Sequence, residues 1–299
     1  MTLYTQQSKN VRKTWLLMLL FLALIIVIGY FLSYYYRSPA ILYFAIIFSI
    51  GLNWVSYWWS DKIVLSMYKA RPANEQLEHD LINTVENLSI TAGLPLPKIF
   101  VIDDMAPNAF ATGRNKEHAT IAVTSGLMKI LNKAEMEGVI AHELSHVGNR
   151  DILLSTVVVT LVGLIAILSD MFTRSIFFGG SRDSENKGGN ILVIVGIVLM
   201  ILAPIVAKLI QLAISRKREF LADASGALLT RYPEGLANAL RKISSYSGQM
   251  QKANNATAHL FISNPFGSKM KGMSKLFMTH PPVEERISAL LCEKENTSN

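Results

Sequence analysis

The sequence predicts a mainly α integral membrane protein, in which four transmembrane helices carry a cytoplasmic α+β domain with a small β-sheet. Two observations lead to this fold class. The 299-residue chain is 51% hydrophobic and only 17% charged, whereas soluble domains have about 25% charged residues. Its apolar residues are concentrated in four uncharged blocks, and the polar stretches between them contain both helical and strand patterns.

The first two apolar blocks, residues 14–32 and 39–59, predict a helical hairpin that crosses the membrane. At 1.5 Å per residue, each block is about as long as the hydrocarbon core is thick, about 30 Å. Trp54, Trp58 and Trp59 close the second block, and such amphipathic rings favour the headgroup region. A cleaved signal peptide is the alternative for the first block, but the apolar run is long for such a peptide and another block follows closely.

The third and fourth blocks, residues 152–169 and 191–207, are near the lower length limit for a membrane span. They predict either two further spans or a buried or re-entrant pair. Basic residues lie before the first block and after the second and fourth, whereas Arg37 is the only one between the first two. By the positive-inside rule, the N-terminus and both large polar stretches should face the cytoplasm.

The first large polar stretch contains a helical pattern followed by two strand patterns. Apolar residues at helical spacing predict a helix over residues 74–92. Runs rich in Ile and Val predict strands over residues 98–102 and 119–123, joined by a loop.

A further helix is expected to begin at Asn132, because Glu135 follows three residues later. No proline interrupts the sequence before the end of the third block, so this helix should run on into the bilayer, with Gly148 as a candidate kink. Later helices are expected over residues 215–229 and from Pro233 and Pro282 onward.

Composition also excludes several classes of site. Cys292 is the only cysteine, so there can be no intrachain disulfide and no Cys-rich zinc framework. Any bound metal must therefore use His, Asp or Glu. The net charge of +7 does not indicate nucleic acid, because the sequence has no arginine-rich cluster interleaved with aromatic residues and several cations flank the apolar blocks.

The pattern His-Glu-x-x-His occurs at residues 142–146, inside a segment predicted as helix. His142 and His146 are one turn apart, so both imidazoles can bind one ion at about 2.0–2.1 Å. Glu143 is rotated by about 100° from His142 and can face a water molecule at the open position of that ion. The pattern predicts a hydrolytic metal site; the alternative is two surface histidines on an amphipathic helix.

A catalytic zinc usually has three protein ligands, so two histidines leave the site incomplete. Glu219 and Asp223 lie one helical turn apart just after the fourth block and should share a helix face near the membrane surface. His146 precedes the third block and Glu219 follows the fourth, and two crossings return the chain to the same side. We therefore expect a carboxylate from this segment in the site; the alternative is that Glu219 only offsets the basic residues 216–218.

Together these features resemble the M48 family of membrane zinc metalloproteases, and within it the bacterial heat-shock endopeptidases of the HtpX type. The similarity extends over nearly the whole chain. It is carried by the His-Glu-x-x-His helix, by Glu-x-x-x-Asp at residues 219–223, by Asn-Ala-Phe-Ala-Thr-Gly at residues 108–113 and by Thr-His-Pro-Pro at residues 279–282.

The resemblance implies a zincin-type (gluzincin) metalloprotease domain built from two separate parts of the chain. These are residues 62–151, with the His-Glu-x-x-His helix, and residues 214–299, with the third zinc ligand. The membrane hairpins would then be residues 1–61 and 152–213.

The resemblance also implies a role for each site residue. One Zn²⁺ per subunit would be bound by His142, His146 and Glu219, with Glu143 as the general base. Asp223 would orient His142, since zinc-bound imidazoles normally donate their second N–H to a carboxylate or carbonyl. His280 would donate a hydrogen bond near the oxyanion, with Arg286 as its support. From the residues alone, His280 is equally well explained as a histidine at a helix start.

Asn108, Ala109 and Phe110 are expected to bind substrate, again by resemblance. In the family this stretch lies beside the cleft, where an edge strand can pair with the substrate backbone. Backbone pairing tolerates many side chains, which suits a protease of broad specificity. Without the family, residues 108–113 could be only a turn between strands.

The expected activity is that of a zinc endopeptidase which hydrolyses misfolded or damaged membrane proteins at the cytoplasmic face of a bacterial plasma membrane, as part of quality control and the stress response. The expected partners are these substrates, the lipid bilayer and other membrane quality-control proteases, but no nucleic acid. Two alternatives are a prenyl-protein (CaaX-type) peptidase, whose family members usually have more spans, and a non-catalytic zinc-binding scaffold, which would have no use for Glu143. A transporter is disfavoured because the four apolar blocks contain no ionisable residue.

Overall fold

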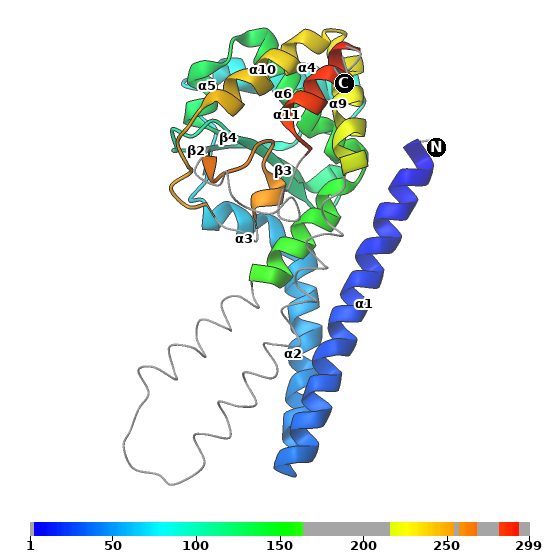
Figure 1. Cartoon of the computed structure of the whole chain (residues 1–299). Coiled ribbons are helices and arrows are strands. Elements are labelled where there is room, and N and C mark those ends of the chain that lie inside the picture. Colours follow the sequence, from blue (N-terminus) through cyan, green and yellow to red (C-terminus); the bar gives the residue numbers. More distant parts are fainter. Residues whose placement is uncertain (1–2, 164–215, 254–256, 268–280, 293–299) are drawn as a thin grey trace, which may run out of the picture.

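A computed structural model describes residues 3–163, 216–253, 257–267 and 281–292 of the chain. The first two helices, α1 (Leu3–Tyr36) and α2 (Pro39–Trp58), form a long antiparallel hairpin (Figure 1). Both are long and apolar enough to cross a membrane, and they correspond to the first two predicted spans. Arg37 makes the tight turn between them with a positive φ of 51°.

The outer surface of this hairpin is apolar. Large side chains such as Phe31, Phe44 and Ile47 are 65%, 67% and 72% exposed. In water this much unburied apolar surface would be unfavourable by about 25 cal/mol per Å², whereas it is compatible with lipid. The structure therefore describes a membrane protein with two candidate membrane helices.

The other two predicted spans lie mostly outside the described residues. Of the third block, the structure describes the apolar helix Asp151–Gly163. The remainder of that block and the whole fourth block, residues 191–207, lie outside the described part of the chain, so these two spans remain predictions.

The polar part contains a four-stranded mixed sheet in the order β1-β2-β4-β3, built from β1 (Arg71–Pro72), β2 (Lys98–Ile102), β3 (Ala109–Gly113) and β4 (Ala119–Thr124). The central strands β2 and β4 are parallel and match the two predicted strands, while β1 and β3 pair antiparallel at the edges. The stretch between the predicted strands is therefore not only a loop, because it contains β3.

Alternate side chains of the sheet pack into two different cores. Ala109, Ala111 and Ile121 face the larger core, which they share with the helices α4 (His79–Ala92), α6 (Lys133–Gly148) and α10 (Pro233–Ser245). Phe110 and Ala122 face the other core, against α3 (Ser60–Met67) and the segment around Phe261. Burial on both faces explains why β3 and β4 show no polar alternation.

Helix α6 is the centre of the domain, and most of its residues are buried. Its predicted start is confirmed: the Asn132 side chain accepts from Glu135 N, and the Glu135 carboxylate accepts from Asn132 N. The remaining elements around it are α5 (Ser125–Ile130), α9 (Arg216–Thr230), α11 (Val283–Leu291) and two short 3₁₀ helices, Lys116–His118 and Ala258–Leu260.

The expectation of one continuous helix from Asn132 into the third block is wrong. Helix α6 ends at Gly148, and the next helix begins at Asp151. Arg150 takes a left-handed conformation with φ 56°, which interrupts the regular helical hydrogen bonds. The break lies just beyond Gly148, and it turns the following residue, Asp151, back toward α6.

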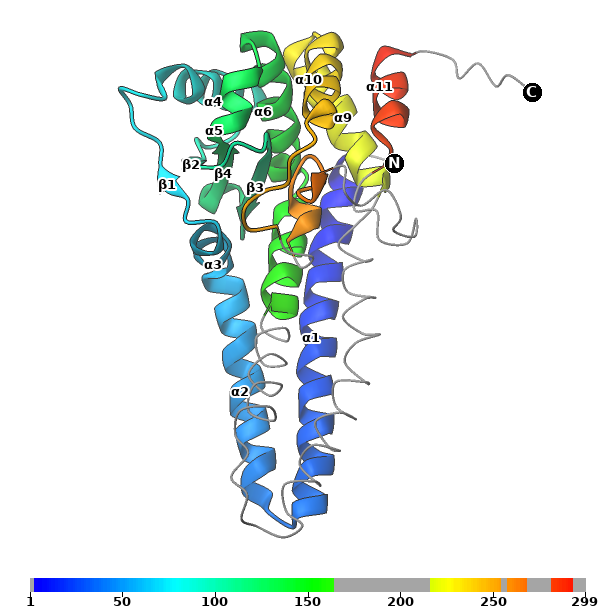
Figure 2. The same cartoon turned by 60° about the vertical axis from the view of Figure 1, so that its left-hand side comes forward.

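In two views the folded domain lies at one end of the hairpin (Figures 1 and 2). This is the end where α1 begins and where α2 continues into α3. The beginning of α1 lies beside the end of α6, where the Gln7 side chain donates to Gly148 O at 2.7 Å.

Candidate metal centre

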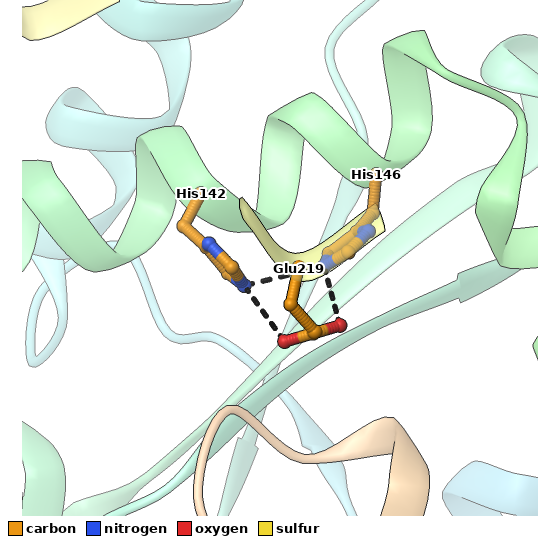
Figure 3. A group of neighbouring side chains, drawn as sticks. All are labelled: His142, His146 and Glu219. Carbon is orange, nitrogen blue, oxygen red and sulfur yellow. Dashed lines mark hydrogen bonds and ion pairs between the residues drawn. The ribbon is translucent and has the colours of Figure 1, made fainter. Parts of the chain in front are cut away.

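The three predicted ligands, His142, His146 and Glu219, come together between α6 and α9 (Figure 3). The Nε2 atoms of His142 and His146 are 3.2 Å apart. The carboxylate of Glu219 faces both rings, with one oxygen 3.9 Å from His142 Nε2 and the other 3.7 Å from His146 Nε2. Glu219 is more than 70 positions away in the sequence from either histidine, so the fold and not the local pattern makes this cluster.

These separations fit a single tetrahedral ion. Two ligand atoms that each lie about 2.0–2.1 Å from a tetrahedral zinc are about 3.3 Å apart. The two imidazoles already meet this value, and Glu219 needs to move by only a fraction of an ångström toward the pair. The donor set of two imidazoles and one carboxylate is able to bind a metal ion.

Helix α9 can bring Glu219 this close because small residues line its contact with α6. Ala222 is completely buried, and Gly226 lies directly against the α6 backbone. A Cβ atom added at Gly226 would lie 3.0 Å from His142 N and 3.2 Å from Ala141 C, closer than ordinary van der Waals contact. The absence of a side chain at Gly226 therefore sets the approach of the two ligand-bearing helices.

The second ring nitrogen of His142 faces a carboxylate, as predicted. His142 Nδ1 is 2.9 Å from Asp223 Oδ1, and Arg286 donates to both oxygens of Asp223 at 2.8 and 2.7 Å and to Ile262 O at 3.1 Å. Burial opposes ionisation of Asp223, but Arg286 holds its pKa below the usual value. Burial lowers the pKa of His142 despite Asp223, so this ring is neutral and its Nε2 lone pair can face an ion.

Asp151 plays the corresponding part for His146, and the sequence did not predict it. Its Oδ2 lies 3.2 Å from His146 Nδ1. Burial alone would lower the pKa of His146, but the hydrogen bond to Asp151 and the charges of Glu219 and Asp151 raise it to about 9. In the absence of a metal, His146 is therefore protonated at neutral pH.

Glu143 is 1% exposed and lies at the side of the ligand cluster. Burial raises its pKa to about 7; the charge of Glu219 acts in the same direction, while His146 and the backbone amide of Ala111 oppose the shift. Its Oε2 has no hydrogen-bond partner among the described residues. Glu143 can thus exchange a proton near neutral pH with a small molecule bound beside it.

A cavity of about 30 Å³ lies over the cluster, which is enough for about two water molecules. Its wall is formed by Ala111 of β3, by Arg218 and by residues 259–262. His259 is therefore on this wall, and its Nε2 lies 3.4 Å from Ser155 O.

The residues predicted to bind substrate lie next to the site but contact the chain itself. The side-chain amide of Asn108 donates to Ser263 O at 3.0 Å, and Ala109 O accepts from Ile262 N at 3.0 Å. Phe110 is buried against Tyr68 and Phe261. Their role in substrate binding stays a prediction. His280 lies outside the described residues, so its place near the oxyanion stays a prediction.

Comparison with known proteins decides the family. Residues 75–294 match the model of peptidase family M48. The chain belongs to this family. It is therefore a metallopeptidase, and its apolar hairpin makes it a membrane metalloprotease.

Relatives of similar length support this assignment. The chain is 48% identical over 295 residues to a protein named "Protease HtpX homolog" from Caldanaerobacter subterraneus subsp. tengcongensis, covering 97% of both chains. A protein of the same name from Syntrophobacter fumaroxidans is 50% identical over 250 residues, which is 82% of this chain and 87% of the relative. The resemblance noted in the sequence is thus confirmed.

One solved structure, that of S. mikatae Ste24p, has a similar fold. Its TM-score is 0.51 at 20% sequence identity, and the alignment covers 90% of this chain and 62% of Ste24p. At this identity the likeness supports the fold alone.

The raised pKa of His146 predicts that metal binding releases about one proton at pH 7. A proton and an ion compete for the same ring, so the apparent affinity for Zn²⁺ should rise by about tenfold per pH unit up to pH 9 and then level off. Calorimetric titration of the metal-free protein with Zn²⁺ in buffers of different ionisation enthalpy measures this release. An affinity that does not change between pH 6.5 and 8.5 would contradict the protonated state of His146.

Proposed function

We propose that the chain is a four-span zinc endopeptidase that cleaves misfolded or damaged membrane proteins at the cytoplasmic face of a bacterial plasma membrane. The observation that supports this most is the meeting of His142, His146 and Glu219 with the unpaired Oε2 of Glu143 beside them. A purely structural metal site would have no use for a carboxylate in that position.

Zinc is the ion that best suits this donor set. Two imidazoles and one carboxylate are typical of catalytic zinc sites that keep a fourth position open. When bound here, zinc would supply Lewis acidity for the scissile carbonyl and lower the pKa of a coordinated water.

Glu143 would move the proton in this reaction. With a pKa of about 7 in the metal-free site, it can accept a proton from the attacking water and pass it to the leaving amine. Asp223 and Arg286 would hold His142 in one orientation throughout, because each carboxylate oxygen of Asp223 is already paired with the guanidinium. Ala111 of β3 closes the other side of the cavity.

Access for a polypeptide requires a movement of the cavity wall. The cavity has room for about two water molecules and is far too small for a peptide segment. Residues 259–262 line it on one side, and Ile262 N donates a hydrogen bond to Ala109 O at the edge of β3. Displacement of this segment would open the site and free the edge of β3 for pairing with substrate backbone.

The cytoplasmic placement rests on charge and on topology. Cations precede α1 and follow α2, as the positive-inside rule expects of cytoplasmic ends. The site lies at the same end of the hairpin (Figure 2). Two further crossings by residues 152–213 would return the chain to this side and bring Glu219 to α6.

Quality control is the role we infer, since several relatives are named as homologues of the protease HtpX. The partners would be unfolded or damaged membrane proteins, together with the bilayer and other membrane quality-control proteases. A site at the end of the membrane helices is well placed for substrates that emerge from the lipid. Family membership favours this enzyme over the non-catalytic scaffold.

The test uses Glu143→Gln and His142→Ala in the detergent-purified full chain. Glu143→Gln should keep its zinc and lose at least about 99% of hydrolysis, because only the proton carrier is removed. His142→Ala should lose both zinc and hydrolysis. Zinc content by mass spectrometry and cleavage of an unfolded membrane protein, with and without chelator, are the two measurements. Full hydrolysis by Glu143→Gln, or by metal-free protein, would overturn the proposal.

A further inference from the structure

We propose that the first membrane helix positions the ligand His146 through Asp151, by way of Asn10. Asn10 lies on α1 and is only 3% exposed. Its side-chain amide donates to Asp151 Oδ1 and also to Asn149 O at 3.2 Å. Asp151 Oδ2 is the atom that faces His146 Nδ1. The two oxygens of one carboxylate thus connect a membrane helix to a metal ligand.

The position of Asn10 within α1 explains how this contact is made. Gln7, Asn10 and Thr14 recur at three- and four-residue intervals, so they share one face of the helix. Gln7 donates to Gly148 O at 2.7 Å, at the end of α6. Asn10 lies at the break between α6 and the next helix, where its side-chain amide donates to Asn149 O. The polar face of α1 therefore docks on the joint that carries Asp151.

Because the helix is broken after Gly148, the orientation of Asp151 depends on its hydrogen bond with Asn10. The helical hydrogen bonds of α6 do not fix the position of Asp151, because the left-handed Arg150 separates the two helices. Without Asn10, one oxygen of a nearly buried carboxylate would lose its donor, and the group could rotate away from the imidazole. Partners of this kind change metal affinity by about 10- to 100-fold when they are removed.

This inference rests on the proposed zinc function, and zinc affinity tests it directly. The full chain is titrated with Zn²⁺ against a chromogenic chelator, and the melting temperature of the metal-free protein is measured in parallel. Asn10→Ala and Asp151→Asn should weaken zinc binding about tenfold or more, while each metal-free variant still melts in a cooperative transition, which shows that it is folded. Gln7→Ala is the matched control, because it removes a docking hydrogen bond at the same joint without touching Asp151, and it should bind zinc normally.

Two results would overturn the inference. One is wild-type zinc affinity in Asn10→Ala. The other is equal weakening in Gln7→Ala, which would mean that only the docking of α1 matters. If the wild type itself binds no zinc, the proposed function fails instead, so the two failures are distinguishable.

A second observation, independent of the metal, points to a binding site for the headgroup of an anionic lipid. A cavity of about 420 Å³ lies where α2 meets the domain. Its lining includes three tryptophans and three cations against one carboxylate, a net formal charge of +2: Trp54, Trp58, Trp59, Lys62, Lys98, Arg114 and Asp61, together with His118.

The cations of this cavity lie at the end of a candidate membrane helix. Trp58 is the last residue of a candidate membrane helix, and partly exposed tryptophans at such an end favour the headgroup region. The Arg114 guanidinium lies 4.3 Å over the Trp58 ring, and its Nη2 is 2.7 Å from His118 Nε2. Arg114 is thus held against the last residue of a candidate membrane helix, and Lys62 and Lys98 line the same cavity. We infer that phosphatidylglycerol or a similar anionic lipid binds here.

Native mass spectrometry of the detergent-purified chain tests this site. Phosphatidylglycerol should be retained several-fold better than phosphatidylcholine of the same acyl chains, and Arg114→Ala should abolish that preference. Arg241→Ala, the same change on α10, should keep it. Lys98→Ala provides a second variant at a strand end, with a partial loss expected. Equal retention of the two lipids by the wild type, or an unchanged preference in Arg114→Ala, would overturn the inference.

Discussion

The site depends above all on the close packing of α9 against α6. His142 and His146 are fixed by one helix, but they become a metal site only when Glu219 approaches from another. Gly226 and Ala222 allow this approach, since a Cβ atom at Gly226 would already press on the backbone of His142. A larger side chain at Gly226 would move Glu219 away from both imidazoles at once.

The packing of α9 against α6 also positions the residues that orient the ligand His142. Asp223 lies one turn after Glu219, so the helix that delivers the third ligand also delivers the partner of His142. Arg286 from α11 then pairs with Asp223 through two hydrogen bonds in a buried position. Loss of one member of such a buried pair typically costs about 3–5 kcal/mol, because the other charge is left without compensation. Glu219, Asp223 and Arg286 thus act as one unit.

Residues close together in the sequence were the easiest to predict. The two histidines of the pattern at residues 142–146 lie one turn apart on a single helix. The Asn132 cap and strands β2 and β4 were likewise predicted from residues that are close together in the sequence. Glu219 could be proposed because the predicted four-span topology would return the chain to the same side of the membrane. Its position within 4 Å of His142 and His146 depends on the tertiary fold and cannot be predicted from sequence spacing alone.

Residues whose role depends on an irregular backbone were missed. Asp151 follows His146 by five positions, which is not a helical spacing, and it reaches the imidazole only because Arg150 adopts a left-handed conformation that no local pattern marks. Asn10 is 141 positions from Asp151 and looks like one polar residue near a membrane helix. From the residues alone, strand β3 could not be told from a turn, because it is short and buried on both faces; only the family resemblance indicated an edge strand there. No pattern in the sequence indicates that His259 lies on the wall of the cavity.

X-ray absorption at the zinc K-edge of the detergent-purified, zinc-loaded chain tests the metal centre most directly. Wild-type protein should show a four-coordinate ion with two imidazole ligands and only N or O donors, at about 2.0–2.1 Å. Glu219→Ala should keep the imidazole scattering but change the shell of light donors and bind zinc more weakly. A sulfur ligand, fewer than two imidazoles, or a spectrum unchanged by Glu219→Ala would contradict the meeting of α6 and α9 around one ion.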